Sequence, residues 1–137
     1  IYNKKFKLMD ESYNANPLSM NLAIKNLNNY QKGVNKILIM GDMLELGIHS
    51  KKHHKILSKV INNTDINKVY VYGDFIQETF KNLKSIKKGK ILKNKVDIKK
   101  LFIENIKNKD LVMIKGSNAT GLFKITQDLK KGKINAI

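Results

Sequence analysis

The chain has 137 residues, of which 42% are hydrophobic and none is cysteine, and its formal net charge is +16. This length corresponds to about one domain with room for a buried core. The lack of cysteine excludes disulfides and thiolate metal sites. No run of residues approaches the ~20 apolar residues of a membrane-spanning helix, and the first ten residues lack the apolar core of a signal peptide. We therefore expect a cytoplasmic protein without a membrane span. Because the chain begins with Ile1 rather than Met, we also expect it to be a piece of a longer protein.

The positive charge is carried by lysine alone, since none of the 27 strongly basic residues is Arg. Arg is the side chain that forms bidentate contacts with guanine and phosphate. The lysines are also spread over every segment of the chain. This pattern favours a compositional bias on solvated surfaces, so we expect no nucleic-acid partner. A basic nucleic-acid binder is the alternative, and it predicts DNA retention that falls steeply with salt.

The first half of the chain alternates short apolar runs with segments of helical period. Residues 6–10 predict a strand, and residues 17–30 predict a helix with Pro17 in its first turn. Residues 36–40 form a continuous apolar run, which is typical of a parallel strand buried on both faces. Ser50 is placed to cap a further helix. The apolar positions of that helix are Ile56, Leu57, Val60 and Ile61.

The second half repeats this alternation. Residues 69–72 predict a strand, followed by a helix, a weaker strand at residues 91–92 and a helix that starts at Asp97. Residues 111–114 predict the last strand, before a helix over about residues 119–129. The helix after the third strand has its apolar face at Phe75, Ile76, Thr79, Phe80 and Leu83. Strands that alternate with helices predict right-handed crossovers and a single α/β domain with an open, mostly parallel sheet flanked by helices.

Three polar loops follow strands of this predicted sheet. They are residues 10–17 (DESYNANP), residues 41–47 (GDMLELG) and residues 115–118 (KGSN). Because loops beyond the carboxyl ends of parallel strands open on one edge of a sheet, their side chains are expected to converge. The sequence therefore predicts one ligand site built from segments that lie far apart along the chain.

The first two loops each allow two interpretations. Asn14 and Asn16 precede the helix at Pro17, so their side chains can cap that helix or donate to a ligand. In the second loop, Asp42 and Glu45 can bind an ammonium group or, through water, a magnesium ion. The leucines beside them can also fold back onto the core. The residue types alone leave these alternatives open.

The third loop offers a cation, a glycine and a hydroxyl at Lys115, Gly116 and Ser117. This combination suits a carboxylate or a phosphate. The spacing from Gly116 to Gly121 is that of a P-loop, but the Lys and the Ser or Thr that must follow are absent. The chain therefore cannot complete an ATP-hydrolysing site by itself.

Three histidines follow the second loop. We expect His54 to face the same edge as the loops, and His49 and His53 to be more exposed. His49 and His53 have the spacing of a metal-binding helical pair, but the required Glu and a third ligand are missing. We therefore expect no metal site in this chain.

Taken together, the loops resemble a known family. Three segments are similar in order and spacing to motifs of the C-terminal domain of the Mur ligase family. They are residues 10–17, residues 41–47 with Ser50 and His54 after them, and residues 112–117 (VMIKGS). The likeness is to the branch that adds D-alanyl-D-alanine, and it covers nearly the whole chain. It implies that residues 1–137 are the third, Rossmann-like domain of a monomeric cytoplasmic enzyme. The N-terminal UDP-binding domain and the central ATPase domain of that enzyme are absent from this chain.

The resemblance also implies a reaction in peptidoglycan precursor synthesis. In the family, ATP phosphorylates the carboxylate of the UDP-N-acetylmuramoyl tripeptide, and the amine of D-alanyl-D-alanine attacks the acyl phosphate. The products are an amide, ADP and phosphate. ATP and Mg²⁺ are the implied cofactors, and both are bound mainly by the missing central domain. This fragment alone is therefore not expected to be active.

Carried over by position, the resemblance assigns binding roles to two groups of residues. It assigns no residue that is certainly catalytic. The nucleotide-binding group is Glu11, Ser12, Tyr13, Asn14 and Asn16. The substrate-binding group is Asp42, Glu45, His54, Lys115, Gly116 and Ser117. Our hypothesis is that Lys115 pairs with the dipeptide carboxylate, and that Asp42 or Glu45 receives its ammonium group. Asn118 stands where the family usually has Arg, so any contact of that guanidinium is lost or moved.

An alternative from another class is a stand-alone nucleotide- or anion-binding module without catalysis. It would use the same Asn-rich and Lys-Gly-Ser loops. The residues encoded before Ile1 distinguish the two hypotheses, because a ligase requires a P-loop and a central ATPase domain there.

Overall fold

The computed structural model describes residues 5–11, 15–116 and 121–130. Its strands form one five-stranded sheet with the spatial order β1-β5-β2-β3-β4. Every strand pairing is parallel, so the predicted α/β sheet is confirmed. The strands are β1 (Lys7–Glu11), β2 (Lys36–Gly41), β3 (Lys68–Tyr72), β4 (Lys88–Leu92) and β5 (Leu111–Lys115).

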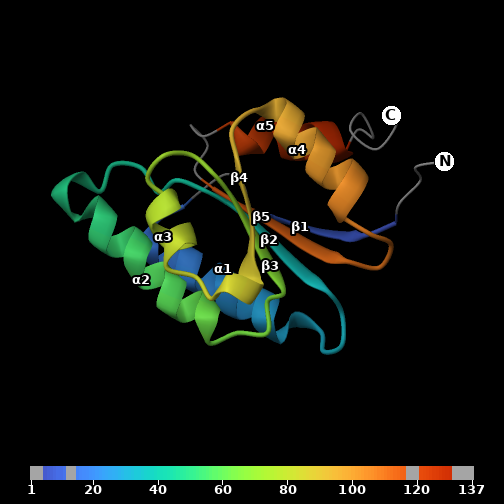
Figure 1. Ribbon diagram of the computed structural model, residues 1–137, viewed down its shortest axis with the longest axis horizontal. Helices are drawn as coiled ribbons and strands as arrows, with labels where there is room; N and C mark the ends of the chain where they lie inside the picture. Colours follow the sequence, from blue (N-terminus) through green and yellow to red (C-terminus); the bar gives the residue numbers. More distant parts are fainter. Residues whose placement is uncertain (1–4, 12–14, 117–120, 131–137) are drawn as a thin grey trace.

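Helices cover both faces of the sheet, as Figure 1 shows. One face carries α1 (Pro17–Tyr30), α2 (Ser50–Asn62) and α3 (Gln77–Lys81). The other carries α4 (Lys95–Lys100), the π-helical turn η3 (Leu101–Asn105) and α5 (Leu122–Lys130). Short 3₁₀ turns, η1 (Gly47–His49) and η2 (Ser85–Lys87), precede α2 and β4.

The alternation of side chains along the strands divides the core into two layers. In β2, Leu38 and Met40 pack on the side of α1 to α3, whereas Ile37 and Ile39 pack on the side of α4 and α5. Every residue of β2 is buried. A central parallel strand with helices on both faces requires such a run of apolar residues, which is why its sequence identifies it.

The start of α1 is determined by a capping box. The Asn16 side chain accepts a hydrogen bond from the Ser19 backbone N–H at 2.8 Å, and the Ser19 hydroxyl accepts one from the Asn16 N–H at 2.9 Å. Pro17 follows as the first helical residue, so the predicted limits of α1 are confirmed.

Other helix boundaries differ from the predictions. Ser50 is the first residue of α2 rather than its cap, because η1 runs directly into the helix. The helix predicted over residues 75–83 is confined to α3, and Phe75 is 52% exposed instead of buried. α4 begins before Asp97, because the Asn94 side chain caps it by accepting from the Asp97 N–H at 2.9 Å.

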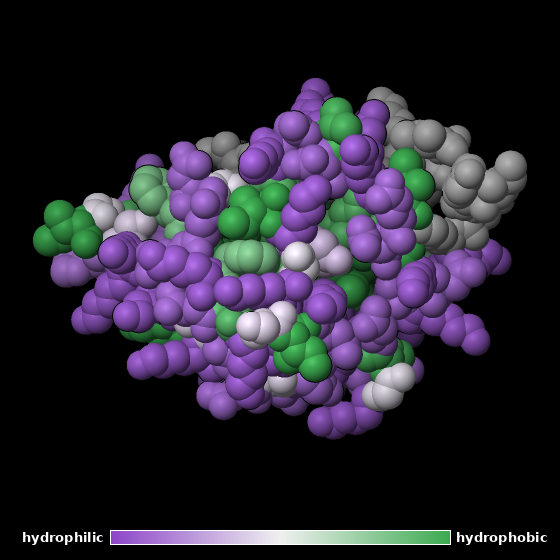
Figure 2. Space-filling view, viewed as in Figure 1, coloured by the Kyte–Doolittle hydropathy of each residue, from purple (hydrophilic) through white to green (hydrophobic). Residues whose placement is uncertain are grey.

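The face of the molecule seen in Figure 2 is mostly hydrophilic. In the view of Figure 2, hydrophilic residues spread over the visible face and apolar residues show in small separate patches. Within the part of the chain that the structure describes, no helix is long and apolar enough to cross a membrane.

Candidate functional site

The parallel register brings the carboxyl ends of the strands to one side of the sheet. Glu11 pairs with Lys115, Lys115 lies opposite Met40, Gly41 pairs with Tyr72, and Tyr72 pairs with Leu92. We call this row of strand ends, Glu11, Lys115, Gly41, Tyr72 and Leu92, the carboxyl edge. The loops after β1, β2 and β5 all start from it, as the sequence predicted.

Along this edge, some neighbouring strands continue into helices on opposite faces of the sheet. In α/β folds, ligands bind at such points. β2 continues into α2 on one face of the sheet, whereas its neighbour β5 continues towards α5 on the other. β3 and β4 diverge in the same way towards α3 and α4. The neighbours β1 and β5 also diverge, towards α1 and α5. A crevice forms where adjacent strands send their loops to opposite faces, so three such points lie along the carboxyl edge.

Lys115 and Glu11 form an ion pair at the ends of β5 and β1. The Lys115 Nζ lies 3.9 Å from the Glu11 Oε1, and the side chains are 3% and 49% exposed. Burial lowers the pKa of Lys115, and the charge of Glu11 opposes that shift. Gly116 is also buried. The edge therefore holds a largely desolvated cation beside a half-exposed carboxylate.

Asn16 lies at the start of α1, where its side-chain oxygen is used by the capping box. Of the two interpretations that the sequence left open, helix capping is the one seen for this oxygen. The side-chain nitrogen takes no part in the cap, so donation to a ligand remains a proposal for that atom.

Asp42 joins the loop after β2 to the connection between β3 and α3. Asp42 is 9% exposed, and its carboxylate accepts a hydrogen bond from the Ile76 N–H at 2.7 Å. Burial raises the pKa of Asp42, whereas the bonds from the Ile76 and Asp74 backbone amides and the nearby His54 lower it. Asp42 thus satisfies backbone amides in a turn that would otherwise leave them unpaired.

His54 is fully buried beneath the same loop. Its Nε2 accepts a hydrogen bond from the Met43 N–H at 3.0 Å, and its Nδ1 lies 2.7 Å from the Ser50 carbonyl oxygen. Because a carbonyl only accepts, Nδ1 carries the proton and the ring is neutral. The Thr79 hydroxyl donates to the His54 carbonyl, which ties α3 to α2. Both ring nitrogens are therefore engaged within the protein.

The burial of His54 makes folding stability depend on pH. Burial lowers the pKa of His54 from its ordinary 6.5, while the Ser50 carbonyl and Asp42 raise it, and the charges of His53 and Glu78 act in opposite directions. The stabilisation is complete above about pH 6.5 and is lost as the pH falls through the lowered pKa, because the unfolded chain then binds the extra proton. Urea unfolding between about pH 7.5 and about pH 5 should show this loss, and His54→Gln should flatten it. Parallel slopes for both proteins would contradict the assignment.

Glu45 is the exposed tip of the loop after β2. Its φ is +62°, one of two positive φ values among the non-glycine residues that the structure describes. A left-handed conformation costs a non-glycine residue about 1–2 kcal/mol. Leu46 packs against the core, as the second interpretation of the leucines predicted, whereas Leu44 lines a cavity. The loop therefore buries Met43, leaves Leu44 and Leu46 partly exposed and leaves Glu45 exposed.

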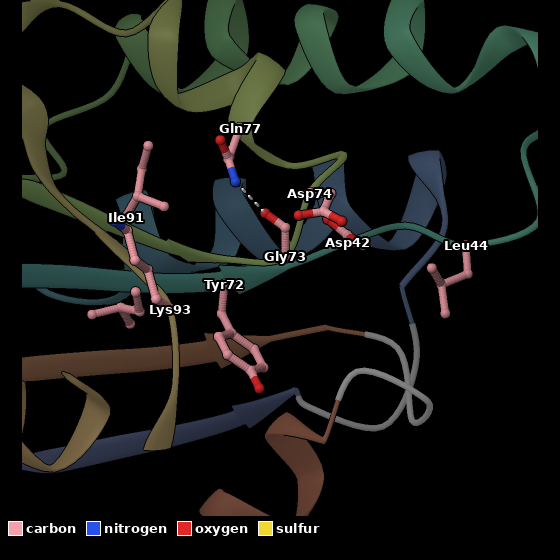
Figure 3. A pocket seen from close by; sticks show the side chains of 9 residues that line it. Asp42, Leu44, Tyr72, Gly73, Asp74, Gln77, Ile91 and Lys93 are labelled. Carbon is pink, nitrogen blue, oxygen red and sulfur yellow. Dashed lines mark hydrogen bonds between the residues drawn. The ribbon is translucent and has the colours of Figure 1, made fainter. Parts of the chain in front are cut away.

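That cavity has a volume of about 770 Å³ and lies at the divergence of β3 and β4 (Figure 3). Asp74 lies beside Asp42 in this view, and the Gln77 amide donates to the Gly73 carbonyl at 3.2 Å. The lining residues are Asp42, Leu44, Tyr72, Gly73, Asp74, Gln77, Ile91, Leu92 and Lys93. Of these, the sequence predicted only Asp42 as a site residue. Leu44 lies in the predicted loop over residues 41–47. The only available signal for the others was their position at or just beyond the ends of the third and fourth strands, because no motif marks them.

Four predicted site residues lie outside the described residues, namely Ser12, Tyr13, Asn14 and Ser117, and so does Asn118. His49 is exposed and His53 is partly exposed, with ring centroids 6.4 Å apart. Among the residues that the structure does describe, no three His, Asp or Glu side chains gather where they could hold a metal ion.

The fold and the edge define the class of protein as a Rossmann-like α/β domain with converging loops at the carboxyl ends of its strands. A family model described as Mur ligase, glutamate ligase domain, matches residues 2–118. Since this match covers most of the chain, the chain belongs to the Mur ligase family.

Curated relatives point to one branch of the family. The UDP-N-acetylmuramoyl-tripeptide--D-alanyl-D-alanine ligase of Buchnera aphidicola subsp. Acyrthosiphon pisum is 35% identical over 127 residues, and that of Bacillus subtilis is 34% identical over 125 residues. These alignments cover 90% and 89% of this chain but only 27% of each relative. The chain thus spans about a quarter of the length of these relatives.

Solved structures agree on the fold. A MurF ligase from Thermotoga maritima in complex with ADP has a TM-score of 0.74 and 24% identity, covering 98% of this chain and 30% of that one. MurF from Acinetobacter baumannii has a TM-score of 0.76 and 25% identity, covering 96% of this chain and 29% of that one.

Proposed function

We propose that this chain is the third domain of a ligase that joins D-alanyl-D-alanine to the UDP-N-acetylmuramoyl tripeptide in peptidoglycan precursor synthesis. Its membership of the Mur ligase family and its similarity to D-alanyl-D-alanine ligases of that family support this proposal. The reaction passes through an acyl phosphate formed with ATP. The enzyme works as a monomer in the cytoplasm, and its other two domains bind the UDP-sugar peptide and most of the ATP and Mg²⁺.

One observation carries the proposal. The loops after β1, β2 and β5, which contain the motifs that resemble the family, start side by side from the carboxyl edge. A domain that presents these loops to a bound acyl phosphate can deliver an amine and shield the intermediate from water. The role of the domain is therefore positioning, while the central domain supplies the phosphoryl transfer.

The two groups of residues keep separate roles in this proposal. Glu11 and Asn16, with the neighbouring residues 12–14, contact the nucleotide. Asp42, Glu45, His54, Lys115, Gly116 and Ser117 form the dipeptide side of the site. Because His54 is fully buried and both its ring nitrogens are engaged, it acts on the substrate through the loop that it supports.

The test is a ligation assay on the full-length protein that contains this chain. With the UDP-N-acetylmuramoyl tripeptide, ATP and Mg²⁺ present, we expect ADP to accumulate over many turnovers only after D-alanyl-D-alanine is added, together with the pentapeptide product. Nucleotide binding without any amide product would instead support the alternative of a binding module without catalysis.

Changing Lys115 to Ala should mainly affect the dipeptide. If its ammonium group pairs with the dipeptide carboxylate, losing that charge-assisted contact raises the dipeptide KM by about tenfold or more, while the ATP KM changes little. Steady-state kinetics of the full-length variant with each substrate varied in turn provides the comparison. Equal increases in both KM values would refute the pairing.

A further inference from the structure

The loop after β2 is held at two consecutive residues. The Asp42 side chain is bound to the Ile76 backbone amide at 2.7 Å, and the Met43 backbone amide is bound to the His54 ring at 3.0 Å. Asp42, Met43 and His54 are all buried. The two bonds run to different elements, the connection before α3 and the helix α2. The base of the loop is therefore fixed from two directions.

The tip of the loop, unlike its base, is exposed and is not held by side-chain hydrogen bonds among the described residues. Glu45 is exposed and has a left-handed backbone, and no hydrogen bond or ion pair to its carboxylate is found among the described residues. Strained residues of this kind persist where the surrounding structure fixes them, and they are common at ligand-binding positions. The other non-glycine residue with positive φ, Lys109, lies in the turn before β5, where its backbone N–H donates to the Lys5 carbonyl at 2.7 Å. The backbone of Lys109 thus has a structural partner, whereas the Glu45 carboxylate has no hydrogen bond or ion pair within the described residues.

We propose that Asp42 and His54 are positioning residues, and that Glu45 is the residue of this loop that meets the amine substrate. Asp42 and His54 fix Met43, and this fixes the direction in which Glu45 leaves the carboxyl edge. Glu45 then receives the ammonium group of the dipeptide before the amine is transferred. This inference rests on the proposed function and divides the residues that the sequence placed together at the dipeptide side.

The burial of each carboxylate supports this division. Asp42 is 9% exposed and its carboxylate already accepts backbone hydrogen bonds, so binding an ammonium group there would require those bonds to be shared. The Glu45 carboxylate is exposed and can approach a ligand without breaking any contact seen here. Asp42 also lies close against Gly73, since a Cβ added there would be 2.5 Å from the Asp42 carboxylate.

The first experiment uses Glu45 variants of the full-length protein. Glu45→Gln removes the charge, and Glu45→Gly removes the carboxylate while relieving the left-handed strain. Both should raise the dipeptide KM by about tenfold or more with little change in the ATP KM. Glu45→Gly should do so without lowering the midpoint of urea unfolding. Lys109→Gly is the matched control, since it relieves the same type of strain far from the carboxyl edge and should leave both KM values unchanged.

The second experiment separates the two bonds of His54. In His54→Gln the side-chain amide reaches the position of Nε2 and can still accept from the Met43 N–H. In His54→Asn the shorter amide reaches only the position of Nδ1, so the bond to Met43 is lost. Hydrogen exchange of the Met43 amide in this chain should accelerate by about tenfold or more in His54→Asn and stay near the original rate in His54→Gln. The dipeptide KM should follow the same order.

Two results would overturn the inference. One is a dipeptide KM within about twofold of the original in both Glu45 variants. The other is slow Met43 exchange in His54→Asn. A full-length protein that forms no ADP with the dipeptide would instead refute the proposed function, and the exchange experiment would still decide whether His54 holds the loop.

Discussion

Gly73→Ala is expected to destabilise the domain by about 3 kcal/mol or more, because two costs combine at this residue. Its φ of +132° is a conformation that residues with a Cβ rarely adopt, which costs about 1–3 kcal/mol. An added Cβ would also lie 2.5 Å from the Asp42 carboxylate, and overpacking of this kind costs about another 1–3 kcal/mol. Asp42 cannot yield without loosening its bond to the Ile76 amide.

The control for this prediction is Gly33→Ala. Gly33 also has a positive φ, +80°, but an added Cβ would meet no atom within 4 Å. Its substitution should cost about 1–2 kcal/mol from backbone strain alone. Urea unfolding of both variants measures the difference in free energy of unfolding. Equal losses of the free energy of unfolding in the two variants would show that the contact with Asp42 does not contribute to the effect of Gly73→Ala.

Lys36→Ala is expected to cost about 3 kcal/mol. Lys36 begins β2 and is fully buried. Its Nζ donates to the Asn28 carbonyl at 2.6 Å and to the two Asp65 carboxylate oxygens at 3.0 and 3.2 Å. The Asn28 carbonyl belongs to the last turn of α1, where backbone acceptors lack helical partners. Alanine removes the buried aliphatic stem and leaves this carbonyl unpaired.

Two companion variants separate packing from charge at Lys36. Lys36→Met keeps the stem and should cost about 1–2 kcal/mol through the lost hydrogen bonds. Asp65→Asn should cost about 1–2 kcal/mol, because the Lys36 side chain is only 1% exposed and loses its counter-charge, while the asparagine oxygen can still accept from the Lys36 Nζ. Denaturant unfolding of the three variants gives the order, and a loss in Asp65→Asn as large as in Lys36→Ala would contradict it.

Much of the fold follows from local patterns in the sequence. The continuous apolar run of β2 and the Asn16 and Pro17 start of α1 have physical causes within a few residues, so they were predicted correctly. The position of β5 between β1 and β2 has no such signal, since it depends on how α4 and η3 return the chain across the sheet. The π-helical turn of η3, closed by the Ile106 N–H bond to the Leu101 carbonyl at 3.0 Å, was also not predictable from the period of the apolar residues.

The site shows the same division between local and distant causes. The sequence placed Glu11, Asp42, Glu45 and Lys115 at the ends of strands, and the register puts their loops on one edge. It could not show that the Asp42 carboxylate is used by Ile76, because that partner lies 34 residues away. The cavity beside Asp74 and Lys93 was missed because it is created by the divergence of β3 and β4, which depends on the strand order.

The most direct test of the central claim, that the carboxyl edge is the ligand-binding edge, is hydrogen exchange of the full-length protein. The amides are compared without ligand and with ADP plus D-alanyl-D-alanine. We expect slower exchange in residues 41–47 and 115–116, and unchanged exchange in the turns at residues 31–35 and 107–110 at the opposite edge. Protection confined to those opposite turns would contradict the claim.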